Sequence, residues 1–270
     1  MELEITHGLQ ATDASPSDVN GICQTGNCTY NAYTSLGVCS SVEDVTPRLV
    51  KSCPPQEDGT RSGCNYTVLD LRDHPTLQGA DFSFSGIGDA LWVGSSLVSH
   101  DGYRYPKNHT LIEFYVVYTS DPSLLGSDPK ANYTAGLVAL KGTLDLCLYS
   151  YYSTVTSGVT KTTQLDVSTN LKWQSGRMNI TRKETPILKT IDADGKSYYI
   201  TDDAILAFNN YLSSVIFQGS VEASSSSDES ISQKAKSDSM QAIYNGITDG
   251  GGIQGLSRLL ENLATSMTNG

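Results

Sequence analysis

The segment from Cys23 to Thr46 constrains this chain more than any other part of it. It places Cys23, Cys28, Cys39 and the N-glycosylation acceptor Asn27 in one short polar stretch. Disulfides persist in oxidising compartments, and N-linked glycans are attached to proteins of the secretory pathway. The segment therefore predicts a domain that folds in the secretory pathway and works outside the cell.

The chain contains six cysteines, and five of them lie in its N-terminal quarter. An even number without any CxxC pair predicts a disulfide framework and no metal site. Six cysteines can pair in many ways, and only Cys53 and Cys64, which flank a turn-rich loop, are expected to form a local bridge. The predicted disulfide cysteines are Cys23, Cys28, Cys39, Cys53, Cys64 and Cys147.

Five Asn-x-Thr triplets support the same compartment, because they exceed the number that chance predicts for this composition. A glycan is bulky and hydrophilic, so each acceptor is expected on an exposed loop or strand edge. The predicted glycosylation sites are Asn27, Asn65, Asn108, Asn132 and Asn179.

The net charge of −11 argues against nucleic acid and anionic membranes as partners, since both attract cationic proteins. Residues 1–22 lack the apolar centre of a signal peptide, and no stretch of the 270 residues is long and apolar enough to span a membrane. We therefore expect an ectodomain fragment whose signal or membrane anchor lies outside this sequence.

Hydrophobic periodicity predicts a β-rich α+β fold, in which C-terminal helices pack on an antiparallel sheet or sandwich with a disulfide-rich N-terminal segment. The expected parts are an extended leader arm (1–22), a disulfide-linked β-rich ectodomain (23–220), a flexible Ser-rich loop (221–239) and C-terminal helices that pack back on the ectodomain (240–270).

The sequence also predicts the residue ranges of several strands and helices. Residues 111–119 form the clearest strand pattern, whereas residues 137–155 form either one long bent strand or two strands that meet near Gly142. Thr201 is expected to cap a helix that runs through Phe217. The leucines of residues 256–267 form one helical stripe, which is a core contact or, alternatively, a membrane or partner site.

Catalytic and metal-binding motifs are absent from the sequence, so we predict no catalytic residue, no cofactor and no metal ligand. The contiguous triplet Ser99, His100 and Asp101 is no triad, because neighbouring strand residues point to opposite faces. The sequence around Asp192 and Asp194 lacks the final carboxylate of a calcium loop and is read as a hairpin turn.

Tyrosine is unusually frequent, with 15 Tyr against five Phe. Exposed Tyr and Trp side chains stack on sugars and peptides, although packing within strands is the simpler explanation. The candidate binding aromatics are Tyr149, Tyr151, Tyr152, Trp92 and Trp173.

The segment CQTGNCTYNAYTSLGVCSSVEDVT resembles the ectodomain signature of a family of filamentous-fungus multi-pass membrane proteins of unknown function, C-P-T-G-N-C-T-W followed by S-L-A-V-C-S-S-C-x-D-V-T. The strand LDLCLYSYYSTVTSGV and the closing helix LENLATSMTNG are similar to two further segments of that family. The first segment matches at Cys23, Gly26, Asn27, Cys28, Thr29, Ser35, Leu36, Val38, Cys39, Ser40, Ser41, Asp44, Val45 and Thr46.

The chain departs from the family pattern at two positions. Val42 stands in place of the second cysteine of C-S-S-C, and Gly142 stands where an extra cysteine often precedes Cys147. We hypothesise that the two missing cysteines are partners, so that one whole bridge has been lost. The resemblance also implies membrane spans on both sides of the ectodomain, and it implies no activity.

These observations lead to one main functional hypothesis and two alternatives. The chain is expected to be the non-enzymatic sensing or binding ectodomain of a fungal membrane protein, with an extracellular glycan or peptide as its ligand. A carbohydrate-active hydrolase that uses two carboxylates is the first alternative, because the chain has many acidic residues. A structural or self-associating ectodomain is the second.

Overall fold

The computed structural model describes residues 23–52, 64–68, 82–84, 89–95, 110–119, 136–169, 171–172, 174–180, 183–191, 195–225 and 231–269. The expected leader arm lies outside these residues. So do Cys53, Asn108, Asn132 and Trp173, which the sequence analysis singled out.

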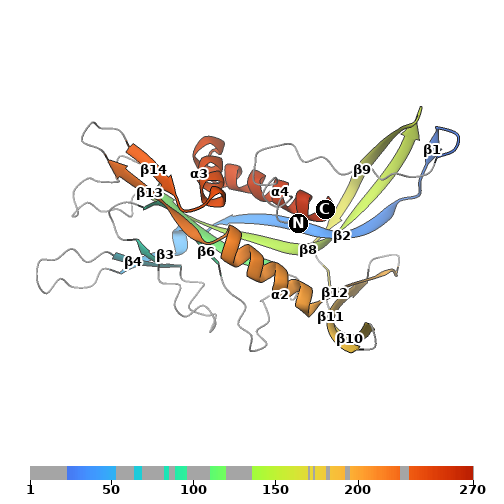
Figure 1. Ribbon diagram of the computed structural model, residues 1–270, viewed down its shortest axis with the longest axis horizontal. Coiled ribbons are helices and arrows are strands. Elements are labelled where there is room, and N and C mark those ends of the chain that lie inside the picture. The colour runs from blue at the N-terminus through green and yellow to red at the C-terminus, as the bar shows by residue number, and fades with distance from the viewer. Residues whose placement is uncertain are drawn as a thin grey trace, which may run out of the picture.

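The described chain forms one large and two small antiparallel sheets, with helices concentrated towards the C-terminus (Figure 1). The large sheet contains β1 (Cys28–Thr29), β2 (Tyr33–Asp44), β6 (Asp89–Ser95), β7 (Thr110–Thr119), β8 (Leu137–Thr156), β9 (Val159–Ser168), β13 (Gly219–Ser225) and β14 (Ile231–Ala235). The small sheets are β3 (Leu49–Ser52), β4 (Cys64–Val68) and β5 (Phe82–Phe84), and β10 (Gln174–Ile180), β11 (Lys183–Ile191) and β12 (Ser197–Thr201). The helices are η1 (Thr46–Arg48), α2 (Asp202–Tyr211), η5 (Leu212–Ile216), α3 (Asp238–Gly250) and α4 (Ile253–Asn269).

Strand β8 is the centre of the large sheet. It is one continuous strand of 20 residues, so the alternative of two strands meeting near Gly142 is wrong. Along one edge β8 pairs with β2 and then β1, and along the other it pairs with β7 and then β9. Its burial pattern alternates over most of its length, as expected for a strand whose side chains point to opposite faces.

The helices cover one face of this sheet and complete the main core. Figure 1 shows α4 running alongside β2 and β8, with the β8–β9 hairpin extending beyond the end of the helix. The leucine stripe of α4 is a core contact, as one of the two alternatives predicted. Its buried members are Leu256, Leu259, Leu260 and Leu263.

Helix α2 begins where the sequence predicts. The Thr201 hydroxyl accepts a hydrogen bond from the Ala204 N–H at 3.2 Å, which satisfies one of the unpaired donors of the first turn. The α-helix ends at Tyr211 and continues as the π-helical turn η5. Fully buried Asn209 donates to the Leu111 carbonyl at 3.0 Å, at the register shift between β7 and β8.

The prediction of a flexible loop at residues 221–239 is wrong for its described residues, 221–225 and 231–239. Strands β13 and β14 pair with each other here, and β13 also pairs with β6 of the large sheet. Val221 is fully buried there. Backbone pairing with an existing sheet edge and burial of this side chain outweigh the low hydrophobicity that led to the loop prediction.

One aromatic pair fills the space above the middle of β8. The Phe114 and Phe217 rings stack with their centroids 3.9 Å apart. Phe114 is the register partner of Gly142, and a Cβ atom added at Gly142 would lie 2.3 Å from the Phe114 ring. On the other side of β8, Gly142 pairs with Val42. Val42 and Gly142, which the hypothesis of a lost bridge links, are therefore direct cross-strand neighbours. Phe114, Gly142 and Val42 form one row across β7, β8 and β2, and the Phe114 ring covers Gly142.

The described residues contain two disulfides. Cys23 pairs with Cys28, and Cys39 of β2 pairs with Cys147 of β8. The expected bridge between Cys53 and Cys64 involves side chains outside the described part of the chain, so it stays a prediction. The Cys39–Cys147 bridge crosslinks the central strand to its neighbour across a sequence separation of 108 residues.

The two bridges should differ in their effect on stability, because loop-closure entropy grows with sequence separation. For separations of 108 and 5 residues, the chain-entropy relation gives about 5 and about 2 kcal/mol. We expect Cys39→Ser/Cys147→Ser to lower the free energy of unfolding more than Cys23→Ser/Cys28→Ser in urea titrations. Equal losses would contradict this ranking.

A Cβ atom at position 142 should destabilise the core. Gly142→Ala forces the Phe114 ring to move, and overpacking of this kind costs about 1–3 kcal/mol. Gly176→Ala is the matched control, since its nearest neighbour would be Ile187 at an ordinary 3.7 Å. Chemical unfolding should show a loss for the first variant and a change within about 0.5 kcal/mol for the second.

Candidate functional site

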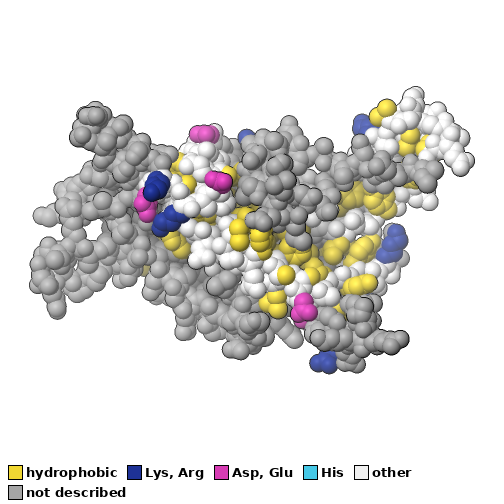
Figure 2. Space-filling view, in the orientation of Figure 1, with side chains coloured by type: hydrophobic (Ala, Val, Ile, Leu, Met, Phe, Trp, Pro, Cys, Tyr) yellow, Lys and Arg dark blue, Asp and Glu magenta, His cyan; other side chains and the backbone are white. Residues whose placement is uncertain are grey.

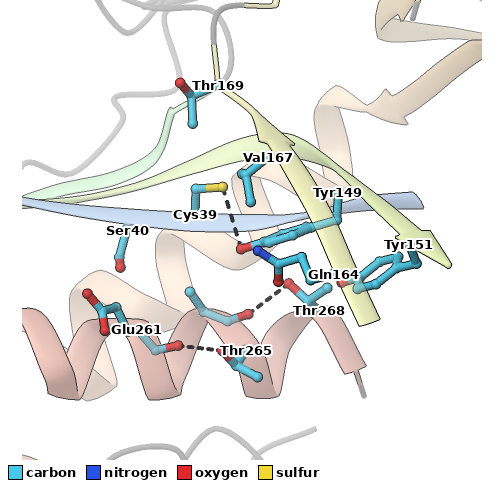
Figure 3. A pocket seen from close by; sticks show the side chains of 11 residues that line it. Cys39, Ser40, Tyr149, Tyr151, Gln164, Val167, Thr169, Glu261, Thr265 and Thr268 are labelled. Carbon is cyan, nitrogen blue, oxygen red and sulfur yellow. Dashed lines mark hydrogen bonds between the residues drawn. The ribbon is translucent and has the colours of Figure 1, made fainter. Parts of the chain in front are cut away.

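A cavity of about 360 Å³ lies between α4 and the ribbon formed by β2, β8 and β9 (Figure 3). This volume is at the lower end of the range for small-molecule sites, which is about 300–1,000 Å³. The lining residues are Cys39, Ser40, Tyr149, Tyr151, Gln164, Val167, Thr169, Glu261, Ala264, Thr265 and Thr268.

A β-bulge brings the strand side of the pocket together. Tyr149 and Tyr151 are two residues apart on β8, but their partners Val167 and Gln164 are three residues apart on β9. The extra residue is Leu165, whose side chain is 57% exposed. Strict alternation would place Val167 and Gln164 on opposite faces, and the bulge lets both line the pocket.

Three tyrosines form a ladder along this face. Tyr33 and Tyr151 are register partners with ring centroids 5.6 Å apart, and the Tyr149 and Tyr151 rings stack with centroids 5.9 Å apart. These distances lie within the range of favourable aromatic pairs. The pocket wall is therefore an aromatic surface whose rings hold one another in place.

Gly37 allows α4 and Tyr149 to approach the edge of β2. A Cβ atom at Gly37 would lie 2.6 Å from the Tyr149 ring and 2.7 Å from the Thr268 methyl group. The Tyr149 hydroxyl donates to the Val38 carbonyl at 2.8 Å, while the Thr268 hydroxyl accepts from the Val38 N–H at 2.9 Å and donates to the Ala264 carbonyl at 2.8 Å. The side chains of Tyr149 and Thr268 thus satisfy the backbone carbonyl and N–H groups of Val38 in β2.

The remaining polar groups face the cavity from three elements. Thr265 donates its hydroxyl proton to the backbone carbonyl of Glu261 at 2.8 Å, which leaves its lone pairs available. Within the described residues, the side chains of Ser40, Gln164 and Glu261 make no hydrogen bond or ion pair. Figure 3 shows Ser40 on β2, Gln164 on β9 beside Tyr149 and Thr268, and Glu261 on α4.

Burial changes the acidity of the two pocket tyrosines. Desolvation raises the pKa of the Tyr149 phenol, and the neighbouring Tyr151 adds to the rise. Desolvation also raises the pKa of Tyr151, with a smaller contribution from Tyr33. Both phenols therefore stay neutral well beyond physiological pH.

The structure separates the five aromatics that the sequence analysis grouped together. Tyr149 and Tyr151 line the pocket, while Tyr152 points to the opposite face of β8. Trp92 lies on β6, where its ring occupies the space that a side chain at Gly94 would need. Trp173 lies outside the described residues.

Three parts of the site were not predicted from the sequence: Gly37, Gln164 and the pocket-lining residues of α4. Gly37 carries a weak signal, because a glycine inside a strand often marks a close approach. Gln164 depends on the bulge at Leu165, and the role of α4 depends on tertiary packing. None of these three is visible as a motif.

Of the predicted glycosylation acceptors, Asn27 is exposed, as an acceptor must be. Its Oδ1 atom accepts from the Ser157 N–H at 2.9 Å, and the Gly158 N–H donates to the Gly26 carbonyl at 2.9 Å. These bonds hold the Cys23–Cys28 loop against the tip of the β8–β9 hairpin. Asn65 and Asn179 lie in strands, and their side chains are outside the described part.

Buried charge in the described sheet serves a structural purpose. Glu113 is 7% exposed, forms an ion pair with Lys141 at 2.8 Å and accepts a hydrogen bond from the Tyr115 hydroxyl at 3.0 Å.

Glu261 is the only carboxylate among the residues that line the pocket. The two-carboxylate hydrolase mechanism therefore finds no support in this cavity.

The described residues hold no cluster of three or more His, Cys, Asp or Glu side chains that could bind a metal ion. In the same part of the chain, no helix combines the length and the apolar character needed to cross a bilayer.

Compared with known proteins, the chain matches no family, no curated protein and no solved structure.

The raised pKa values of Tyr149 and Tyr151 predict a loss of stability in alkali. Above the ordinary value of 10.0 the unfolded state ionises first, so the free energy of unfolding falls as pH rises through the folded-state values. Tyr149→Phe/Tyr151→Phe should make this fall shallower. Denaturant titrations between about pH 9 and pH 12 measure it. Identical slopes in the two proteins would contradict the assignment.

Proposed function

We propose that this chain is an extracellular, N-glycosylated binding module of a fungal membrane protein, and that it holds a sugar residue of a glycan in the pocket between α4 and the β2–β8–β9 ribbon. The proposed compartment is supported by the two disulfides and by the exposed acceptor Asn27. The resemblance of the Cys23–Thr46 segment supports the proposed origin.

One observation carries the proposed activity. The Tyr149 and Tyr151 rings line a concave site that also offers a free amide, a hydroxyl and a carboxylate. Sugars present an apolar face of C–H groups bordered by hydroxyls, and aromatic rings next to polar groups match this arrangement. A glycan fits the site better than an extended peptide, because α4 is packed along the edge of β2 where an added strand would pair.

The described part of the face in Figure 2 carries no large patch of either charge. Hydrophobic side chains form a band on it that runs from the helices towards the β8–β9 hairpin. Acidic and basic side chains on this part are interspersed. Long-range charge from this face would therefore contribute little to the recognition of a neutral glycan.

Gln164 and Thr163 provide a matched test. They are neighbours on β9 and both are exposed, but only Gln164 lines the pocket. Gln164→Ala should weaken the binding of a glycan from a panel of neutral and charged oligosaccharides about five- to tenfold, which corresponds to one hydrogen bond of about 1–1.5 kcal/mol. Thr163→Ala should leave the affinity unchanged.

Nuclear magnetic resonance titration of the 270-residue chain measures both affinities and locates the ligand. Shift changes should centre on β9, β8 and α4, where the lining residues lie. If no glycan in the panel, neutral or charged, changes any of these signals, the proposed function is wrong. Equal losses in the two variants would show that the ligand binds elsewhere.

A further inference from the structure

The charge of the pocket lining has one sign. Glu261 is exposed and carries the only formal charge among the lining residues, and no Lys, Arg or His contributes to the wall. The Tyr149 and Tyr151 phenols are neutral at physiological pH, because burial raises their pKa values. The whole chain carries a net charge of −11. Any charged group on a ligand would therefore meet only negative charge here.

Three of the polar groups around the cavity act as acceptors. The Tyr149 hydroxyl proton is committed to the Val38 carbonyl, and the Thr265 proton is committed to the carbonyl of Glu261. Towards the cavity, both hydroxyl oxygens can only accept. The Glu261 carboxylate accepts as well. The Ser40 hydroxyl and the Gln164 amide can both donate and accept, so they can bind the hydroxyl groups of a sugar.

The acidic group and the aromatic wall lie towards different ends of the same pocket. Glu261 precedes Thr268 by seven positions on α4, which is about 10 Å along a helix axis. Thr268 contacts the Gly37 position beside the Tyr149 ring. Figure 3 shows Glu261 and Ser40 towards one end of the pocket and Tyr151 towards the other. A ligand that extends along the pocket would therefore contact both the aromatic wall and the carboxylate.

We propose that the pocket selects an amine-bearing sugar, whose ring stacks on Tyr149 and whose ammonium group is held by Glu261. This inference rests on the proposed function, because it specifies the ligand class of the same site. An ammonium group has only donors and no acceptor, so it complements the Glu261 carboxylate. Its attraction to an exposed carboxylate is modest.

The test compares three sugars that differ in charge on the same ring: glucosamine, glucose and glucuronate. Nuclear magnetic resonance titration of the whole chain at about pH 6, where the amine is protonated, gives the three dissociation constants. Glucosamine should bind roughly two- to fivefold more tightly than glucose, and glucuronate should bind most weakly. Raising the salt concentration should reduce the difference.

Glu261→Gln should bring the ratio of the glucosamine and glucose affinities to about one. Asp166→Asn is the matched control, because Asp166 is exposed on β9 and does not line the pocket. It changes the net charge by the same amount and should preserve the ratio. Thermal unfolding of both variants verifies that they are folded.

The outcomes separate this inference from the proposed function. Equal binding of all three sugars, or a glucosamine preference that survives Glu261→Gln, overturns the charge selection and leaves a neutral glycan site. Binding of Nα-acetyl-lysine amide as tight as that of glucosamine overturns the sugar assignment in favour of a cationic peptide. If glycans of the oligosaccharide panel bind but none of these three sugars does, the amine-sugar assignment alone fails. No binding of any sugar, in this comparison or in the panel, refutes the proposed function itself.

Discussion

The pairing of β8 on both edges is the constraint on which the rest of the described structure depends. One strand of 20 residues joins β1 and β2 on one side to β7 and β9 on the other. Each inter-strand bond depends on the register of its neighbours, so the ladder acts as a unit. The Cys39–Cys147 bridge adds a covalent link between β8 and β2. The pocket is built on the same strand and takes its geometry from it.

Close contacts between glycines and aromatic rings recur across this sheet. Gly37 makes room for Tyr149, Gly94 for Trp92 and Gly142 for Phe114. In each case a Cβ atom would lie within 3 Å of the ring. An aromatic ring over a strand glycine restores the packing and burial that the glycine lacks. Much of the aromatic content therefore stabilises the sheet, and a Tyr or Trp is a ligand contact only where a cavity adjoins it.

The row formed by Val42, Gly142 and Phe114 gives a physical reading of the departure from the family pattern. Val42 and Gly142 are direct partners, so cysteines at these positions would face each other across β2 and β8. In this chain the Phe114 ring occupies the space over Gly142 and stacks on Phe217. Apolar packing in this row thus stands where the hypothesis of a lost bridge places a crosslink. It also connects β7 to Phe217, directly after η5, and covers β8.

Local periodicity and capping chemistry were enough to predict the β-rich class, the cap at Thr201, the leucine stripe of α4 and a strand at residues 111–119. They could not place the β13–β14 hairpin, which forms by pairing with the distant strand β6. The high frequency of tyrosine pointed to Tyr149 and Tyr151 as candidates. Their pocket with Gln164 and Glu261 could not be predicted from the amino-acid order, because the bulge at Leu165 and the packing of α4 depend on contacts between residues far apart in the chain.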